Sequence, residues 1–315
     1  MTLSKSAAVL MAALLVAAAA QGWHDPGHQR TTRLALAALP ESMPSFLADG
    51  ADTIAHLAFE PDVFRALMDD TDLDRTESPQ HYFDLEHLEG VDIPTARFDM
   101  LRWCGRNNLR PDQVGLAPYA IVEWTQRLTS ALAEHRAWPD NPHIRTKCLV
   151  YAGLLAHYAQ DICQPLHTTV HYDGRLDEAG RSPTSGIHQK VDALIGKLPD
   201  DLDLAIDPVA AQPLDDLFAG IIAEIRSSHA RVDRLYELED QLPDPDESLQ
   251  ADSPVGRFAA ERARAAATFT ARLYATAWRD SASIEIPPWH DRSAEPSPPA
   301  TQPAAAPATM PAGGG

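Results

Sequence analysis

The sequence predicts an all-α protein with a single helical domain over residues 23–292. Apolar residues recur at three- and four-residue spacing over long stretches, the alternation of β-strands is hard to find, and prolines follow the periodic stretches. Hydrophobic residues make up 44% of the 315, which is enough to form a core. Neither an internal repeat nor a domain boundary is evident.

Five stretches carry the helical pattern. A short helix is expected over 31–39, stopped by Pro40, and longer ones over 117–135 and 144–163. The third is the most apolar and precedes Pro165, so we expect it at the centre of the fold. Two long amphipathic helices follow, and an acidic, proline-containing loop over 237–254 joins them. These two helices are expected at 214–238 and 255–282.

The two ends of the chain have other characters. Residues 1–22 combine an early lysine, an apolar run over 7–20 and small residues before Trp23, which is typical of a cleaved signal peptide. We therefore expect a secreted or periplasmic protein that begins at Trp23. Residues 293–315 are rich in proline and alanine and end in three glycines, which predicts a disordered tail.

Charge and cysteine content exclude several classes. The net charge of −19 argues against stable binding to duplex DNA. Three cysteines allow at most one disulfide, and the apolar surroundings of Cys148 and Cys163 favour buried thiols. Outside the signal segment there is no apolar run of 18 residues, so no transmembrane helix is expected in the mature chain.

Several histidines stand at spacings that suit metal ligands. His157 and Asp161 are four residues apart on one helix face, and Pro165 ends that helix so that His167 can turn back beside them. The pair His188 and Asp192 repeats the four-residue step. Imidazole and carboxylate together suit Zn²⁺, although either pair taken alone is also typical of a surface ion pair. Three further candidates lie upstream: His28, Asp62 and His81.

These motifs resemble the trinuclear-zinc phosphodiesterases, which include the single-strand-specific nucleases of the S-one/P-one type and the bacterial zinc-dependent phospholipases C. The pattern His-x3-Asp-x5-His, followed by His-x3-acid, runs from His157 to Asp192, and the wording Asp-Ile-x-Gln-Pro-Leu-His begins at Asp161. The signal cleavage exposes Trp23, and the family uses an N-terminal tryptophan as a metal ligand. The resemblance covers most of the mature chain and implies the family's helical fold.

The resemblance implies three zinc ions and their ligands. Asp62, His81 and His157 would bind the first ion, and Asp161 would bridge it to a second ion held by Trp23 and His28. His167, His188 and Asp192 would hold the third. A hydroxide bridging two of the ions would then attack the phosphorus, with Asp62, Arg65 and Asp161 as the catalytic residues. Asp62 is preferred over four neighbouring aspartates because Arg65 follows it; the four are Asp69, Asp70, Asp72 and Asp74.

Three local features favour the nuclease branch over the phospholipase branch. The Trp23-x4-His28 gap is short, the last acid is Asp192 rather than glutamate, and Asp62-x-x-Arg65 matches the nuclease pattern. The arginine would face the phosphate, although a surface arginine is an equal alternative. By resemblance Tyr82 would stack on a base and Asp84 would bind its edge, whereas packing of Tyr82 in the core is the competing interpretation.

The expected function is therefore hydrolysis of single-stranded DNA or RNA by a monomeric, exported zinc enzyme, with 3′-nucleotidase activity in addition. A phospholipase C acting on phospholipid headgroups is the alternative, and a zinc-binding protein without activity is a third hypothesis. The chain departs from the family in one respect that bears on the substrate. Its segment between His81 and His157 is long, which gives material for a different substrate rim.

Overall fold

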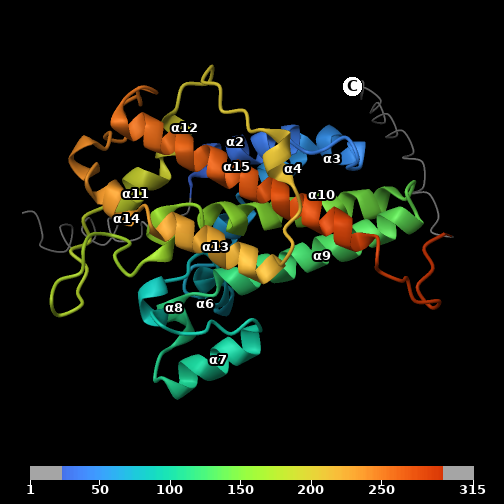
Figure 1. Ribbon diagram of the computed structural model, residues 1–315, viewed down its shortest axis with the longest axis horizontal. Coiled ribbons are helices and arrows are strands. Elements are labelled where there is room, and N and C mark those ends of the chain that lie inside the picture. The colour runs from blue at the N-terminus through green and yellow to red at the C-terminus, as the bar shows by residue number, and fades with distance from the viewer. Residues whose placement is uncertain (1–22, 294–315) are drawn as a thin grey trace, which may run out of the picture.

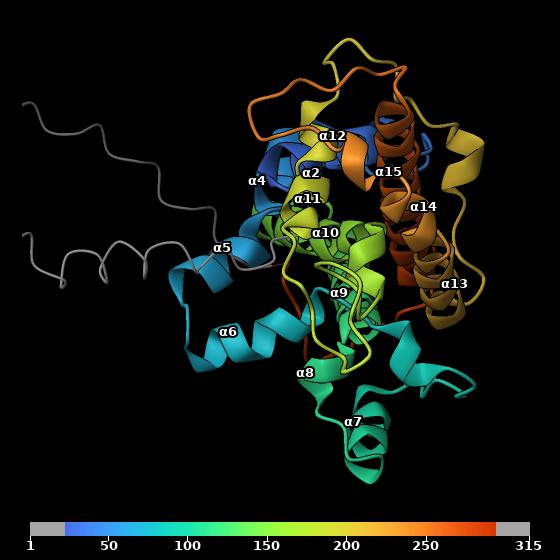
Figure 2. The same ribbon diagram turned by 90° about the vertical axis from the view of Figure 1, so that its left-hand side faces the viewer.

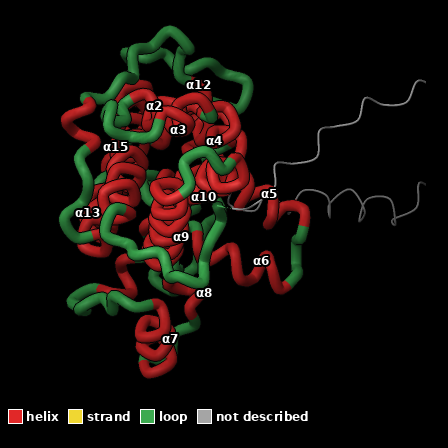
Figure 3. The backbone as a smooth tube through the Cα atoms, turned by 90° about the vertical axis from the view of Figure 1, so that its right-hand side faces the viewer, coloured by secondary structure: helices red, strands yellow, loops and turns green. Residues whose placement is uncertain are grey.

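A computed structural model describes residues 23–293 as helices joined by loops (Figure 1). No β-strand forms in this part of the chain (Figure 3), which confirms the predicted all-α class. None of the helices between residues 23 and 293 is long and apolar enough to cross a membrane. The predicted signal segment 1–22 and residues 294–315 of the predicted tail lie outside the described residues.

Three long helices form the centre of the molecule. These are α9 (Ala117–Ala137), α10 (Pro142–Asp161) and α15 (Pro254–Ser281), which pack side by side (Figure 1). Leucines of α9 and α10 and phenylalanines of α15 lie fully buried between them. The sequence predicted all three to within two residues at each end, because their apolar periodicity is strong.

Helix α10 owes its bounds to its flanking residues. The side chain of Asn141 accepts hydrogen bonds from the amides of His143 and Ile144, and Pro142 supplies the first turn. The helix ends at Asp161, and Gln164 then caps the 3₁₀ turn η3 (Pro165–Thr168). The 3₁₀ turn therefore begins four residues after Asp161, close to the helix end that carries His157 and Asp161.

Helix α2 (Asp25–Ala37) packs against α10 together with α4 (Ala51–Leu57), and α3 (Ser45–Asp49) joins them. The predicted helix 31–39 was wrong at its start, because Pro26 occupies the first turn of α2 and extends it toward the N-terminus. Gly153 lets α10 approach α4 closely, since a Cβ atom there would lie 2.5 Å from Leu57 Cβ. Helix α5 (Glu60–Leu67) follows α4 in the chain and also contacts α10.

The predicted helix 214–238 is two helices, α13 (Leu217–His229) and α14 (Val232–Tyr236). The break has a tertiary cause: His229 Nδ1 lies 2.8 Å from the carbonyl oxygen of Thr168, which ties the end of α13 to η3. Helix α14 packs against the same turn. The loop predicted over 237–254 is present, apart from the 3₁₀ turn η5 (Glu239–Gln241).

The remaining elements are short and lie at the periphery, where the sequence pattern predicted none of them. Helices α5 and α6 (Asp72–Glu77) project from one side of the bundle and α7 (Arg97–Arg106) from the bottom (Figure 2). The others are η1 (Ser78–Gln80), η2 (Leu85–Leu88), α8 (Pro111–Val114), α11 (Ile187–Asp192), α12 (Leu194–Lys197) and η4 (Pro208–Ala211). All three cysteines are buried and free, as expected for Cys148 and Cys163.

Candidate metal centre

All nine residues predicted as metal ligands are buried in the structure. They come from the segment two residues before α2, from α2 itself, α5, the residue after η1, the last turns of α10, η3 and α11. The nine are Trp23, His28, Asp62, His81, His157, Asp161, His167, His188 and Asp192. Elements that are distant in the sequence therefore bring these side chains to the end of α10.

Asp161 lies at the centre of the first group of histidines. Its Oδ2 lies 3.0 Å from His81 Nδ1 and 3.3 Å from His157 Nε2, and its Oδ1 lies 3.4 Å from His28 Nε2. Asp62 Oδ1 lies 3.7 Å from His81 Nδ1. A single carboxylate thus faces three imidazoles with both of its oxygens, as a bridging ligand would.

A second group lies between η3 and α11. His167 Nε2 and His188 Nε2 are 3.1 Å apart, and His188 Nε2 lies 3.3 Å from Asp192 Oδ2. The left-handed backbone of Gly186, with φ of 79°, precedes α11 and starts the helix that carries both residues.

Oxygen acceptors fix the orientation of four of the five histidines. Each of the four has Nδ1 within 3.2 Å of a backbone or amide carbonyl oxygen. A nitrogen that donates to a carbonyl carries the proton, so the opposite Nε2 presents its lone pair. The pairs are His28 with Gln160, His157 with Ala58, His167 with His81, and His188 with Tyr172.

The Nε2 atom of His157 lies 2.9 Å from His81 Nδ1 and 3.3 Å from Asp161 Oδ2, whereas the Nε2 lone pairs of His28, His167 and His188 meet no N–H or O–H donor of the described chain. The Nε2 lone pairs of His167 and His188 face each other at 3.1 Å, an arrangement that a cation between them stabilises. Of the eight buried side-chain atoms that make no hydrogen bond within the described chain, four belong to predicted ligands: His28 Nε2, Asp62 Oδ2, His81 Nε2 and Asp161 Oδ1. Buried polar atoms are almost always satisfied, so this concentration of exceptions indicates metal-ion sites.

The spacings fit tetrahedral zinc. Two ligand atoms on one tetrahedral Zn²⁺ ion are about 3.3 Å apart when each bond is about 2.0 Å. The distances of 3.3 and 3.4 Å from Asp161 to His157 and His28, and of 3.3 Å from His188 to Asp192, match this value. Imidazole and carboxylate are ligands that zinc favours. The residues therefore fit the ion that the sequence motifs suggest.

Three sets of ligand atoms lie within 4.8 Å of one another: His28, Asp62, His157; His81, His157, Asp161; and His167, His188, Asp192. The third is the set predicted for one ion. The first two share His157 and divide the remaining residues differently from the predicted sets, which paired His28 with Trp23 and Asp161. The division of ligands between these two ions stays a prediction.

Charge and burial act in opposite directions on the buried groups. Burial disfavours charge on His157, but Asp161 beside it outweighs that effect and raises the pKa of His157 to about 9. Burial also opposes ionisation of Asp161, yet His157 and His167 hold its pKa well below the usual range. Burial lowers the pKa of His81 to about 4 and that of His188 to about 3, so both imidazoles stay neutral near pH 7.

Trp23 is anchored next to the site by its side chain. The indole Nε1 donates a hydrogen bond to the carbonyl oxygen of Gln160 at 3.1 Å, and the ring is fully buried. The side chain of Gln160 also meets His28, so one residue of α10 contacts both. The start of the predicted mature chain therefore lies beside Asp161.

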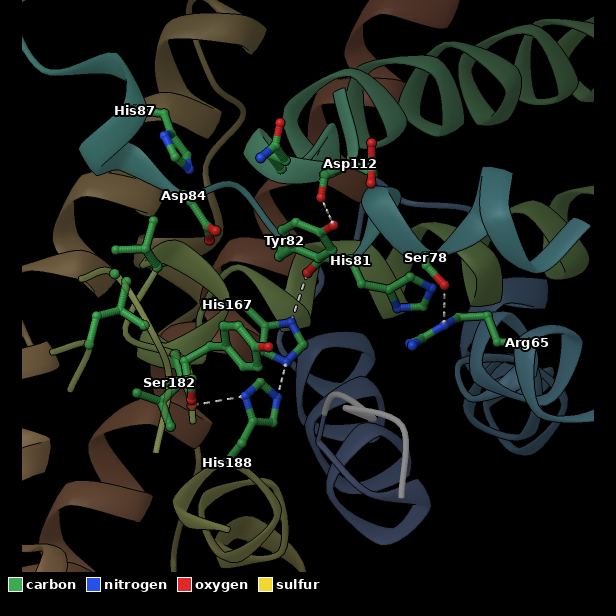
Figure 4. Close-up of a pocket in the computed structure, with 16 residues that line it drawn as sticks. Arg65, Ser78, His81, Tyr82, Asp84, His87, Asp112, His167, Ser182 and His188 are labelled. Carbon is green, nitrogen blue, oxygen red and sulfur yellow. Dashed lines mark hydrogen bonds between the residues drawn. The ribbon is translucent and has the colours of Figure 1, made fainter. Parts of the chain in front are cut away.

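A cavity of about 530 Å³ opens beside the histidines (Figure 4). Arg65, His81, His167 and His188 line one part of it, and Tyr82 lines it as well. The Arg65 side chain is 12% exposed and its Nη1 lies 3.2 Å from Asp62 Oδ1. Arg65 therefore belongs to the cavity wall and is fixed there by its ion pair with Asp62. This position differs from that of an ordinary surface arginine, which was the alternative.

Tyr82 and Asp84 line the same cavity, with Tyr82 beside His81 and Asp84 beside His87 (Figure 4). Tyr82 is half-buried with its hydroxyl donating to the carbonyl oxygen of Asp112, whereas the adjacent Phe83 occupies the core. Burial, reinforced by Glu86, raises the pKa of Asp84 well above its usual range. The wall thus offers an aromatic face and a carboxyl group within one cavity.

Asp62, the aspartate that the sequence analysis preferred because Arg65 follows it, is the one that lies beside the histidine cluster. Asp62 is 2% exposed, whereas Asp69, Asp70 and Asp72 are exposed on the α5–α6 turn. Asp74 lies beside Arg65 Nε at 4.0 Å and accepts a hydrogen bond from Ser78. The acidic residues of the turn therefore do not join the histidine cluster.

The sequence analysis missed three residues that support the ligands. Gln160 orients His28, and Gln164 donates to Asp192 Oδ1 at 2.8 Å. Glu77 accepts the hydroxyl hydrogen bond of Tyr158 and lies 3.8 Å from His81 Nε2. Two glutamines in an otherwise apolar stretch, one and three residues from Asp161, were the signal that could have revealed the first two.

Comparison with known proteins adds no assignment, since no protein-family model matches this chain and no curated protein is significantly similar to it.

Proposed function

We propose that this protein is an exported, zinc-dependent phosphodiesterase that hydrolyses single-stranded nucleic acids, with 3′-nucleotidase activity in addition. The observation that supports it best is the convergence of five histidine and three aspartate side chains whose ligand atoms lie at zinc-ligand distances beside a cavity. Bound zinc ions supply Lewis-acid activation of water and of the phosphate.

The chain's own residues orient the reaction. Arg65 faces the cavity while Asp62 and Ser78 hold its guanidinium, so it is positioned to donate hydrogen bonds to a phosphate oxygen. Charge grows on the phosphate oxygens as a phosphodiester bond is cleaved, and a preoriented guanidinium stabilises that charge. No nucleophilic side chain is required, because water supplies the attacking oxygen.

The far wall of the cavity suits a base better than a lipid headgroup. Tyr82 offers a flat ring for stacking, and Asp84, with its raised pKa, retains its proton to higher pH than an ordinary carboxyl group. A protonated carboxyl group both donates and accepts hydrogen bonds, which matches the mixed edge of a base. The proposed substrate is therefore a strand whose bases are unpaired.

A phospholipase C is the second candidate, on one specific observation. Leu67, Met68 and Leu73 are exposed apolar residues of α5, α6 and the turn between them, close to Arg65 in the sequence, and exposed apolar residues can contact a lipid surface. The aspartates of the same turn argue against a phospholipase C, because they repel the phosphates of a bilayer surface.

The test is a parallel assay of protein processed to begin at Trp23 and loaded with zinc. Single-stranded DNA, single-stranded RNA and phosphatidylcholine are the three substrates, each with and without a chelator. We expect nucleotide release that the chelator abolishes, with no lipid turnover. Lipid turnover alone would transfer the protein to the second candidate, and silence on all three with zinc bound would remove the enzymatic proposal.

Arg65→Ala provides a sharper control within the same assay. Removing the guanidinium leaves every proposed metal ligand in place, so we expect kcat to fall about a hundredfold or more while zinc content stays near that of the wild type. Loss of zinc in parallel with activity would assign Arg65 a structural role.

A further inference from the structure

Helix α7 carries a basic and aromatic surface in an acidic protein. Residues 97–110 contain four arginines against one aspartate, a formal charge of +3 in a chain of −19. The helix stands away from the bundle at the bottom of Figures 1 and 2. It lies in the long segment between His81 and His157.

The two faces of α7 differ in character. Met100 and Cys104 are fully buried on the inner face, and Arg97 anchors the helix to α9 by a paired contact with Glu123. The outer face repeats every four residues and presents Phe98, 72% exposed, followed by Arg102 and Arg106. An exposed phenylalanine aligned with two arginines provides one stacking surface and two phosphate contacts.

The chain connects α7 to the wall of the proposed active site through Arg110 and α8. Arg110 lies between α7 and α8, and its Nη2 lies 2.8 Å from the carboxylate of Asp112. Asp112 lines the cavity, and its carbonyl oxygen accepts the hydroxyl hydrogen bond of Tyr82. A strand whose base contacts Tyr82 would therefore leave the cavity toward α7.

We propose that the outer face of α7, defined by Phe98, Arg102 and Arg106, binds the part of a single-stranded nucleic acid that extends beyond the cavity. The inference rests on the proposed nuclease function. Charge complementarity selects this occupant, because Arg102 and Arg106 present positive charge on the exposed face of α7, whereas the chain as a whole carries −19 and repels a polyphosphate backbone. The ion pair of Arg102 with Asp99 is exposed on both sides, so a phosphate can compete for it.

The experiment measures binding separately from cleavage. Fluorescence anisotropy follows the binding of a labelled single-stranded DNA of 20 nucleotides, whose phosphorothioate linkages resist cleavage, to zinc-loaded protein that begins at Trp23. We expect Arg102→Ala/Arg106→Ala to weaken binding about tenfold and to reduce the slope of log K against log salt concentration by about 1.4, since each contact with single strands contributes about 0.7. Phe98→Ala should weaken binding about tenfold without changing the slope.

Arg226→Ala/Arg234→Ala is the matched control. It removes the same charge from α13 and α14, which contribute no residue to the cavity, and it should bind as the wild type does. Equal losses in both double variants, or wild-type binding by the α7 variants, would overturn the proposal. Binding of phosphatidylglycerol vesicles through α7 in place of the DNA would overturn it as well.

A dinucleotide distinguishes this inference from the proposed function. It is too short to reach α7, so the zinc-loaded α7 variants should hydrolyse it at the wild-type rate. If the α7 variants hydrolyse the dinucleotide and bind DNA as the wild type does, the α7 proposal is contradicted while the nuclease proposal stands. Loss of DNA binding in these variants, with no hydrolysis by the wild type, would remove the nuclease proposal alone.

Discussion

At the scale of single residues, Asp161 has the most demanding position in the molecule. It faces His28, His81 and His157 from the last turn of α10, and its Oδ1 makes no hydrogen bond within the described residues. A carboxylate in this position either bridges two cations or stays strongly paired with protonated imidazole.

Asp161→Asn tests the bridging role by metal content. Asparagine keeps the shape but loses the charge, so we expect loss of two of three zinc ions and of activity. Asp192→Asn is the matched variant, since Asp192 faces His188 in the third set and is not predicted to bridge two ions, and it should lose a single ion. Elemental analysis after gel filtration gives both counts, and equal losses in the two variants would contradict the bridge.

His157 makes metal binding depend on pH. The pKa of His157 is raised to about 9 in the metal-free fold, so below that pH the ring carries a proton that a bound ion excludes. Zinc affinity should therefore rise with pH up to about 9, and binding at pH 7.5 should release at least one proton. The sign for folding is opposite: this proton stabilises the metal-free fold fully below about 6.5, and its contribution is lost as pH rises through 9.

Calorimetric titration of zinc at pH 7.5 in buffers of different ionisation enthalpy measures the released protons. A heat that does not depend on the buffer would contradict the assignment, and repeating the titration above pH 9 is the control in which the dependence should shrink.

At the scale of elements, the contact between α10 and α4 positions the α5 residues of the site. Gly153 permits it, because a Cβ atom at this position would lie 2.5 Å from Leu57 Cβ and 2.9 Å from the carbonyl oxygen of Ile54. Helix α5 follows α4 directly and carries Asp62 and Arg65. A small residue in the middle of one helix thus fixes the distance to ligands on another.

Gly153→Ala should lower the free energy of unfolding by about 1–3 kcal/mol, because the added methyl group forces the two helices apart. Gly105→Ala on α7 is the matched control: no atom lies within 4 Å of its Cβ position, so it should be neutral or stabilise the protein by up to about 1 kcal/mol. Urea unfolding of the two variants gives the comparison. Equal effects would show that the close approach is not limiting.

The elements also show how far the sequence could be interpreted. Strong periodicity predicted α9, α10 and α15, and the four-residue spacings predicted that His157 lies beside Asp161 and His188 beside Asp192, as the structure shows. The break between α13 and α14 was not predictable, since it depends on the contact of His229 with Thr168, 61 residues away in the sequence. The short helices α5 to α8 were not predicted for a related reason. They contain too few turns to show a periodic pattern, and their positions depend on tertiary contacts.

The site residues also divide into those that a local pattern predicts and those that only tertiary contacts place. His157, Asp161, His167, His188 and Asp192 follow fixed local spacings and were identified together. The partition of ligands between two of the ions was not, because it depends on where α2 and α5 lie relative to α10. Glu77 gave no local signal, and only its packing beneath His81 and Tyr158 reveals a role.

At the scale of the whole molecule, metal ions should contribute to folding as well as to chemistry. The candidate ligands come from five separate regions of the chain, and the unfolded chain does not hold them together. Zinc at a hundredfold excess over its dissociation constant should add about 2.7 kcal/mol of stability per independent site.

We therefore expect chelation to lower Tm by at least about 5 °C, since 1 kcal/mol corresponds to about 2–4 °C for a chain of this size. Differential scanning calorimetry with zinc, with chelator, and with magnesium at the zinc concentration measures the effect. Magnesium should not restore the higher Tm, because imidazole is a poor ligand for it. An unchanged Tm after chelation would count against the metal centre.

The position of the cluster at the end of α10 also fixes an order of events. The last turn of a helix presents carbonyl oxygens and a partial negative charge, and here Asp161 adds a full one. His157, protonated below about pH 9 in the metal-free fold, offsets this charge but is fully buried, so a phosphate arriving before the cations would meet Arg65 in the cavity wall and no bound metal ion. The ions must therefore enter first and the polyanion second, so zinc supply governs whether the protein accepts its substrate at all.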